Sequence, residues 1–444
     1  MQFLGWIAAA GALFLSMSLA SAWFRRGPVT SFSLYLLTGI LCGPWIADVI
    51  RIDIVIHAEW VRRITDIAMA ASLFITGLKL RQSLTAQPWR IGGLLAFPAM
   101  VMTVFSMAIV AHYLAGLPWV ISLAFGAIVA PTDPVLASLI TVNNARDDDS
   151  LRSTLSVEAG LNDGSALPFL MLALLLYGNP QELMSWTFFP KWGLIHVLWA
   201  LSAGLIVGYL LGLGIGMLAT RMRHIYQDIA PNDLIALSLI ALSYAVAQYI
   251  DASGFLSAFA AGVGLRRAEK NIISQNPRDE SKGDERTPPA EELVNPNTRH
   301  NLESNGPVKS VGLVVGDAIS FGSTLERLFA AAIVIMLGIT LSQHWDPRGI
   351  YLGLILFLLV RPVTVYCMTF CTQLPRTRRV LLGWFGIKGI GSINYIAYAY
   401  VHGLHGSASA EMINIAITLV VTSVIIHGIT VAPVLQSRKL TGRD

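Results

Sequence analysis

Two carboxylates lie inside stretches that are otherwise apolar enough to be buried in a lipid bilayer. Asp133 belongs to LAFGAIVAPTDPVLASLI, and Asp163 belongs to VEAGLNDGSALPFLMLALLL. An ionised carboxylate at bilayer depth is costly unless it is hydrated, paired or liganded. Pro131 and Pro134 flank Asp133 and remove backbone donors, so a helix must break there. Such a break survives only where the freed groups line a cavity or bind something, which predicts an ion or proton pathway.

Composition favours an all-α polytopic membrane protein. Hydrophobic residues make up 54% of the sequence and charged residues only 13%, which excludes an ordinary soluble domain. Apolar stretches of roughly 20 residues, the length that spans a bilayer as a helix, recur along the chain. The spans hold no nucleophile–base pair and no cluster of metal ligands, so the sequence does not indicate an enzyme. No basic footprint for nucleic acid is present.

Apolar stretches and basic loops together predict about thirteen transmembrane helices. Their approximate ranges are 3–24, 29–47, 60–78, 91–114, 119–141, 152–177, 192–219, 232–250, 254–266, 319–342, 350–373, 380–402 and 411–434. Basic residues collect at alternate ends of these spans, beginning with Arg25 and Arg26 after the first. Because basic loops stay in the cytoplasm, we expect a multi-pass inner (plasma) membrane protein with its N-terminus outside and its C-terminus cytoplasmic.

The spans fall into two groups on either side of a polar stretch. Residues 1–267 would hold nine helices, including the first half of the core and the ion site. Residues 268–317 are rich in charge, Pro, Asn and Ser, which predicts a mostly disordered cytoplasmic loop, either a linker or a regulatory segment. Residues 318–436 would hold the last four helices and the second half of the core, and residues 437–444 a cytoplasmic tail.

Two spans are interrupted at corresponding places in the two halves. One contains PTDP at 131–134, and the other contains FGIKGIGS at 385–392, whose three glycines weaken a helix. Interrupted helices at matching places are typical of transporters built on inverted repeats. Asp133 in the first interruption would face Lys388 in the second, and the two charges would neutralise the ends of the crossed half-helices.

Asp163 is the candidate carrier of ions and protons. It lies about three turns into its span, where burial brings proton binding and cation binding into competition near neutral pH. A hard monovalent cation prefers oxygen ligands, and Thr132 offers a hydroxyl and a freed carbonyl. Asn162 and Asp133 complete the predicted ion site, with Ser156 a weaker ligand candidate. The competing interpretation of Asp163 is a structural carboxylate hydrogen-bonded to neighbouring helices.

Glu158 and Arg361 are predicted to form a structural ion pair. Arg361 lies in the middle of the span at 350–373 and reaches neither interface, so it requires a carboxylate partner. Glu158 is intramembrane and one helical turn before Asn162. The alternative is that Glu158 itself carries ions.

Four segments carry a family resemblance that spans nearly the whole chain: APTDPV at 130–135, EAGLNDG at 158–164, Arg361-Pro362 and GIKGIGS at 386–392. In order and placement they resemble the cation:proton antiporter family 1, close to its NhaP-type sodium/proton antiporters. The resemblance implies a homodimer with a dimerisation domain and a six-helix core. It also implies that Thr132 and Asp133 lie in an unwound crossing helix and Asp163 in the ion site.

The resemblance also bears on stoichiometry and ion preference. Asn162 stands where electrogenic relatives carry a second aspartate, which implies electroneutral one-for-one exchange. Members often have a serine where this chain has Ala159, an acidic residue where it has Ile75, and an arginine where it has Lys388. Fewer side-chain ligands would leave more of the coordination to water and backbone.

The expected function is secondary active exchange of Na⁺ or K⁺ for protons, with one carboxylate alternately binding cation or proton and with a role in pH homeostasis. No cofactor is expected. One alternative is a potassium efflux channel-like system, which usually carries a soluble nucleotide-binding domain. Another is a proton-coupled carrier of an organic or anionic substrate, which should place an unpaired basic group at the midplane. Arg361 and Lys388 both have predicted carboxylate partners.

Overall fold

The computed structural model describes residues 11, 15, 30–136, 140, 142, 149–179, 181, 187–226, 232–276, 289–293 and 306–441. Within those ranges the regular structure is entirely helical, which confirms the predicted all-α class. The first predicted span, apart from Gly11 and Leu15, lies outside the described residues, as do Arg25 and Arg26.

The first part of the chain folds into six α-helices. They are α2 (Ser31–Cys42), α3 (Ala58–Lys79), α4 (Gln87–Leu94), α5 (Met100–Ala115), α6 (Trp119–Val129) and α7 (Ser150–Gly178). A π-helical turn at Leu95–Ala99 joins α4 to α5 in one continuous segment. Pro98 lies inside that turn, and its missing N–H explains why the helix widens there.

The rest of the described chain adds ten helices. They are α8 (Phe188–Trp192), α9 (Ala200–Tyr226), α10 (Asn232–Tyr249), α11 (Gly254–Gln275), α12 (Pro307–Thr340), α13 (Arg348–Ile355), α14 (Arg361–Thr369), α15 (Arg376–Trp384), α16 (Ile390–Val401) and α17 (Ser407–Thr441). Further π-helical turns, at Gly193–Trp199 and Leu356–Val360, join α8 to α9 and α13 to α14.

Six described segments are long and apolar enough to cross a membrane: Gln87–Ala115, Ser150–Gly178, Phe188–Met222, Pro307–Thr340, Arg348–Thr369 and Ser407–Val431. Ser31–Cys42, Trp119–Val129 and Leu234–Tyr249 are apolar but shorter. The described residues therefore establish a multi-pass helical architecture and leave the predicted total of thirteen spans open. The helix α6 is short because it ends just before Pro131.

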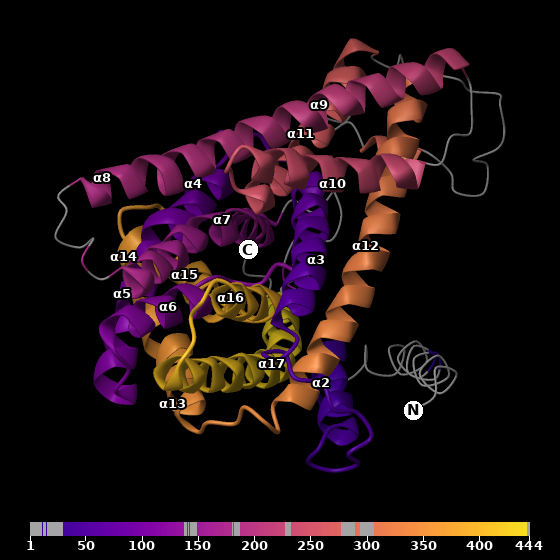
Figure 1. The fold of residues 1–444 in the computed structure, drawn as a ribbon. Coiled ribbons are helices and arrows are strands. Elements are labelled where there is room, and N and C mark those ends of the chain that lie inside the picture. The colour runs from indigo at the N-terminus through magenta and orange to yellow at the C-terminus, as the bar shows by residue number, and fades with distance from the viewer. Residues whose placement is uncertain are drawn as a thin grey trace.

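The helices form two groups that meet chiefly along α3 (Figure 1). We call α2, α3, α9, α10, α11 and α12 the scaffold group, because they pack mainly against one another. We call α4–α7 and α13–α17 the core group. The helix α3 packs against α11 and α12 on its scaffold side and against α16 and α7 on its core side. Any movement of one group relative to the other must therefore change the contacts that α3 makes with the core group.

Glycines fix α3 tightly to the scaffold group. A Cβ atom added at Gly262 of α11 would lie 2.0 Å from the carbonyl oxygen of Phe74 on α3. A Cβ atom at Gly77 of α3 would lie 2.2 Å from the carbonyl oxygen of Phe259 on α11. Small residues at both positions let the two backbones touch, as is typical of helix pairs in membranes.

The prediction that residues 268–317 form a loop is wrong at both ends. The helix α11 continues to Gln275, and α12 already begins at Pro307. The charged residues at the end of α11 are paired inside the protein: Arg266 lies 3.3 Å from Glu269 and 2.8 Å from Glu291. Charge in the sequence was interpreted as solvent exposure, whereas these groups compensate one another. Residues 277–288 and 294–305 lie outside the described part of the chain.

Candidate functional site

The two predicted interruptions lie side by side. After α6 the chain leaves the helix through Pro131–Pro134, and between α15 and α16 residues 385–389 are non-helical. The backbone N–H of Asp133 donates to the carbonyl oxygen of Ile387 at 2.9 Å. Backbone groups released by one break are thus satisfied by the other, which is the condition for irregular backbone at membrane depth.

Asp133 caps the start of α16. Its side chain is 2% exposed, and Oδ2 accepts a hydrogen bond from the backbone N–H of Gly391 at 3.1 Å. Oδ1 accepts from the N–H groups of Val135 and Leu136 at 2.8 and 3.1 Å. A negative group at a helix N-terminus satisfies free N–H donors and complements the helix dipole. A Cβ atom at Gly389 would lie 2.6 Å from Oδ2, so this close approach requires glycine.

Lys388 is a positive group that binds free carbonyl oxygens at the C-terminal end of α6. Its Nζ donates to the carbonyl oxygens of Ala130 at 2.5 Å and Pro131 at 3.0 Å, and its side chain is fully buried. Among the described residues, Lys388 and Asp133 form no ion pair within 4.0 Å. Each charge therefore neutralises a helix end through backbone atoms, in place of the direct pairing that opposite charges would suggest.

Asn162 holds the broken end of α6 to α7. Its Nδ2 donates to the carbonyl oxygen of Thr132 at 3.1 Å and to Thr132 Oγ1 at 2.5 Å. Both oxygens that the sequence offers from Thr132 as cation ligands thus already accept from Asn162. The Oδ1 atom of Asn162 is buried without a hydrogen-bond partner among the described residues. It is an oxygen available for a ligand.

Asp163, the next residue, is fully buried, and neither carboxylate oxygen has a hydrogen-bond partner in the described part of the chain. A Cβ atom at Gly391 would lie 3.2 Å from its Oδ1, so the carboxylate faces the first turn of α16. The hydroxyl of Tyr395 donates to the backbone oxygen of Asp163. Buried polar groups are almost always hydrogen-bonded, so a carboxylate without partners indicates a site for a proton or a cation.

Glu158 lies on the same helix and has a partner. Its Oε1 is 2.6 Å from Nη1 of Arg361, and its Oε2 accepts from Nη2 at 2.8 Å. Both side chains are buried, and Arg361 also donates to the carbonyl oxygen of Leu382 at 3.3 Å. The ion pair joins α7 to α14, and the hydrogen bond to Leu382 extends the contact to the end of α15. It matches the pairing expected from the sequence.

Other residues that the sequence singled out stand apart from Asp163. Ser156, the weaker ligand candidate, accepts from the N–H of Val142 at 3.0 Å and donates to the carbonyl of Arg152 at 2.9 Å. Both contacts are to backbone atoms, and Ser156 lies about two helical turns before Asp163. Ala159 is buried and brings no polar atom to the site.

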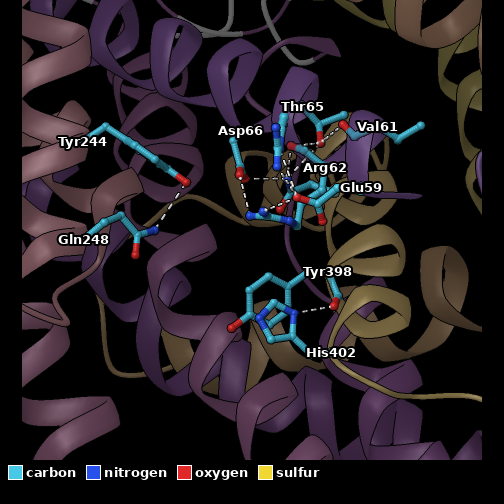
Figure 2. A network of polar contacts seen from close by, with 11 residues as sticks. Glu59, Val61, Arg62, Thr65, Asp66, Tyr244, Gln248, Tyr398 and His402 are labelled. Atoms are coloured by element: carbon cyan, nitrogen blue, oxygen red, sulfur yellow. Dashed lines mark hydrogen bonds and ion pairs between the residues drawn. The ribbon is translucent and has the colours of Figure 1, made fainter. Parts of the chain in front are cut away.

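Sequence reasoning missed a polar contact between the two groups of helices at the N-terminal end of α3. Asn394 of α16 donates from Nδ2 to Thr65 Oγ1 and to Asp66 Oδ1, both at 2.8 Å. Figure 2 shows Arg62 between Glu59 and Asp66, which it contacts at 3.3 and 3.2 Å. Asp66 lies inside the span predicted at 60–78, and only the packing of α16 against α3 reveals that it contacts the core group.

Sequence reasoning also missed Glu326 on α12. It is buried, and its Oε1 accepts from Ser72 Oγ of α3 at 3.1 Å. A signal was available, because Glu326 is an acidic residue inside the span predicted at 319–342. The rule that singled out Asp163 applies equally to it.

Comparison with known proteins agrees with this geometry. A family model described as "Sodium/hydrogen exchanger, transmembrane" matches residues 12–282 and 298–437. The chain is 23% identical to the K⁺/H⁺ antiporter NhaP of Alkalimonas amylolytica over 432 residues, covering 97% of this chain and 66% of that protein. It is 22% identical to the Na⁺/H⁺ antiporter NhaH of Halobacillus dabanensis over 350 residues, covering 77% of this chain and 74% of that protein.

The length of the relatives varies widely. A probable Na⁺/H⁺ antiporter of Schizosaccharomyces pombe matches 39% of this chain, at 28% identity, but only 23% of its own length. The chain thus spans about two thirds of the NhaP protein and less than a quarter of the yeast protein.

A solved structure shares the fold. The sodium proton antiporter MjNhaP1 from Methanocaldococcus jannaschii superposes with a TM-score of 0.64 at 18% identity, covering 96% of this chain and 100% of that chain. The matched family is one of transmembrane exchangers and not of enzymes. Because its model covers most of the sequence, the chain belongs to the transmembrane sodium/hydrogen exchanger family.

Proposed function

We propose that this chain is a secondary active antiporter that exchanges a monovalent cation, Na⁺ or K⁺, for protons across a membrane. The observation that carries the proposal is the carboxylate of Asp163, which is fully buried and has no hydrogen-bond partner among the described residues. An ionised carboxylate there must be compensated by a proton or a cation, because nothing else described neutralises it at hydrogen-bond distance. Relatives named as K⁺/H⁺ and as Na⁺/H⁺ antiporters both support the reaction class.

One carboxylate that binds either ligand is the simplest exchange device. When Asp163 releases its proton on one side, the carboxylate takes up one cation, and the neutral pair crosses. On the other side a proton displaces the cation, and the neutral carboxylic acid returns. One positive charge moves in each direction, so the cycle exchanges one cation for one proton and moves no net charge.

The neighbouring residues supply oxygen ligands and hold the broken helices. Asn162 Oδ1, which has no hydrogen-bond partner in the described residues, and Thr132 Oγ1 are the side-chain oxygens we assign beside Asp163. Asp133 and Lys388 neutralise the helix ends where the breaks meet. These four side chains shape the site and keep the backbone around it in place.

The Glu158–Arg361 ion pair has a structural role in this proposal. Its two N···O contacts, at 2.6 and 2.8 Å, give the carboxylate of Glu158 a permanent counter-charge, which a transported ion would have to displace. We assign it to holding α7 against α14 while Asp163 changes its ligand.

Alternating exposure of Asp163 requires the core group to move against the scaffold group. The boundary along α3 is the surface for that movement, and α3 stays with α11 because their backbones touch at glycines. We place the protein in the inner (plasma) membrane as a homodimer with a cytoplasmic C-terminus and a role in pH homeostasis.

The alternative functions find less support in the site. A carrier of an anionic substrate needs a free basic group beside the site. Lys388 is occupied by the carbonyls of Ala130 and Pro131, and Arg361 is occupied by Glu158. A potassium channel would need a continuous path, whereas Asp163 has no exposed surface.

The test uses purified protein in proteoliposomes with an imposed pH gradient and an interior pH dye. Sodium, potassium and lithium are added in turn, with and without a clamped membrane potential. The proposal expects dissipation of the gradient by at least one cation, at a rate that does not depend on the potential. Folded protein that responds to none of them would overturn cation exchange, and a rate that follows the potential would overturn the one-for-one stoichiometry.

A further inference from the structure

Glu326 of α12 is a buried acid that the exchange cycle at Asp163 does not use. It is 8% exposed, and its Oε1 accepts a hydrogen bond from Ser72 Oγ at 3.1 Å. In the described part of the chain it forms no ion pair within 4.0 Å. A carboxylate inside an apolar span without a counter-charge is a functional group by default, because burial opposes its charge.

Close helix packing places Glu326 against α3. Gly322 lies one turn before Glu326, and a Cβ atom there would lie 2.2 Å from Cδ1 of Ile75 on α3. Glycine at this position lets α12 approach α3 closely, so that the Glu326 carboxylate reaches the hydroxyl of Ser72. The contact is built into the scaffold group, to which both helices belong.

The face of α3 that carries Ser72 continues to Asp163. Met69 lies one turn from Ser72, and the position of a Cβ at Gly391 is 3.7 Å from Met69 Cε and 3.2 Å from Asp163 Oδ1. In the other direction the same face carries Thr76 and Lys79. This face of α3 therefore runs from the end that holds Lys79, past Glu326, to the neighbourhood of the Asp163 carboxylate.

The charged groups around Glu326 come from α3, from α12 itself and from the break after α6. Lys79 of α3 and Arg327 of α12 act on it electrostatically as cations, and Asp133 acts on it as an anion. Neither cation lies within ion-pair distance of the carboxylate. A monovalent cation can therefore bind the Glu326 carboxylate in place of these groups. Electrostatic repulsion by Lys79 would make that binding brief.

We propose that Glu326 is a second, transient cation site on the transport path, lying between Asp163 and the end of α3 that carries Lys79. Its ligands for a partly hydrated monovalent cation are the carboxylate and the hydroxyl of Ser72, both hard oxygen donors. The site rests on the proposed function, since it passes its cation to Asp163. It belongs to the scaffold group and Asp163 to the core group, so the movement that exposes Asp163 also changes the separation of the two carboxylates.

A transient site of this kind raises the local cation concentration and does not decide whether exchange occurs. Glu326→Gln should therefore raise the apparent KM for the cation by roughly fivefold to tenfold while leaving the maximal rate within about twofold. Glu326→Asp should restore part of the affinity, and Ser72→Ala should give a smaller rise in KM. Unchanged KM in folded Glu326→Gln would overturn the proposal.

The matched control is Glu269→Gln. Glu269 is also buried in the scaffold group, but it is paired with Arg266 and lies at the far end of α11. Its loss should lower thermal stability and leave the cation KM unchanged. If Glu269→Gln raised KM as much as Glu326→Gln, the effect would be a general loss of buried charge and the proposed site would be wrong.

A binding measurement distinguishes failure of this inference from failure of the proposed function. It can also be made on variants whose transport is too slow to measure. In detergent, the transition temperature of Asp163→Asn is measured against increasing NaCl or KCl, with choline chloride as the ionic-strength control. Stabilisation by the cation that persists in Asp163→Asn and is lost in Asp163→Asn/Glu326→Gln supports a second site. No cation-specific stabilisation in Asp163→Asn would overturn it, and a wild-type protein without cation-driven exchange would instead overturn the proposed function.

Discussion

Two buried carboxylates on α7, Glu158 and Asp163, lie five residues apart and differ in the partners that surround them. Both are 0% exposed. Glu158 is held by Arg361 through two contacts at 2.6 and 2.8 Å, whereas both oxygens of Asp163 lack a hydrogen-bond partner in the described residues. Both side chains end in a carboxylate and both are buried to the same extent, so the presence of a counter-charge is what separates a structural carboxylate from an exchangeable one.

The physical reason is the cost of a buried charge. Arg361 compensates the charge of Glu158 permanently, and no proton or cation can replace the arginine without breaking the pair. Asp163 has no permanent compensation, so its charge must be neutralised by something that arrives and leaves. The following predictions test that difference, from the largest expected effect to the smallest.

The contrast between Glu158 and Asp163 is wrong if cation–proton exchange does not require Asp163. Asp163→Asn keeps the shape of the side chain and removes the exchangeable charge, so we expect exchange in proteoliposomes to fall to the rate of empty vesicles. Because no partner is lost, the transition temperature should stay at or above that of the wild type. Cation-driven proton movement that persists in the variant would remove Asp163 from the mechanism. Glu411→Gln, an exposed acid outside the site, serves as the control for handling and reconstitution.

The opposite outcome is expected at the paired carboxylate. Arg361→Ala leaves Glu158 buried without a counter-charge, so the free energy of unfolding should fall by about 3–5 kcal/mol. Thermal unfolding in detergent measures this as a lower transition temperature and a reduced yield of monodisperse protein. Glu158→Gln/Arg361→Met removes both charges and should recover much of the loss. An Arg361→Ala protein as stable as the wild type would refute the structural role of the pair.

The polar contact beside Asp163 should have an intermediate effect. Thr132→Val removes the hydroxyl that accepts from Asn162 Nδ2 but leaves the backbone acceptor. We expect a loss of about 1 kcal/mol in stability and, because the hydroxyl is also the assigned cation ligand, a rise of about fivefold in apparent KM. Thr103→Val is the matched control, because Thr103 is a buried threonine that bonds Ala99 and Thr364 away from Asp163. Equal KM changes in both variants would exclude Thr132 as a ligand.

A third carboxylate, Asp53, has a partner whose charge depends on pH, because that partner is His344. Asp53 lies between α2 and α3, and His344, between α12 and α13, approaches its Oδ1 at 3.0 Å while contacting Asn414 at 2.7 Å. Burial lowers the pKa of His344, but the hydrogen bonds with Asp53 and Asn414 outweigh it and raise the pKa above 6.5. Burial raises the pKa of Asp53, but the hydrogen bonds from His344 and from the N–H groups of Val55 and Ile56 outweigh it and lower the pKa below 3.8.

The sign of the pH dependence follows from these shifts. The contribution of His344 is fully present below pH 6.5 and is lost as the pH rises through its raised folded-state pKa. The contribution of Asp53 is present above pH 3.8 and is lost as the pH falls through its lowered pKa. The transition temperature of the wild type should therefore drop relative to His344→Gln as the pH rises above 6.5, by an amount equivalent to about 1 kcal/mol or less. Parallel pH profiles of the two proteins would refute a charged pair.

Several parts of the site were accessible from the sequence because they obey local rules. Pro131 and Pro134 lack a backbone N–H, so α6 had to end before them. Arg361 sits in the middle of an apolar span and required a buried acid, and the structure places Glu158 against it. Glu326 obeyed the same rule as Asp163 and was available to sequence reasoning, although it was not singled out.

Other parts were not accessible, because they depend on contacts between distant segments. The charged end of α11 was predicted to be a loop, since nothing local shows that Arg266 would be paired with Glu269 and Glu291. Opposite charges at Asp133 and Lys388 suggested a direct contact, but each binds backbone atoms of the other broken helix. Geometry at the crossing decides this, because the helix ends present free N–H and C=O groups nearer than the opposite charge.

The sequence by itself determined the membrane-spanning helical class, the two helix breaks and the set of acids that burial would make costly. These follow from apolar length, from proline and glycine, and from the solvation of charge, which are properties of short segments. Only the tertiary structure decided which acids have partners. Glu158 meets an arginine 203 residues away, Glu326 meets a serine 254 residues away, and Asp163 meets none among the described residues. Compensation of a buried charge depends on what the folded chain brings within about 3 Å of it, and no local pattern carries that information.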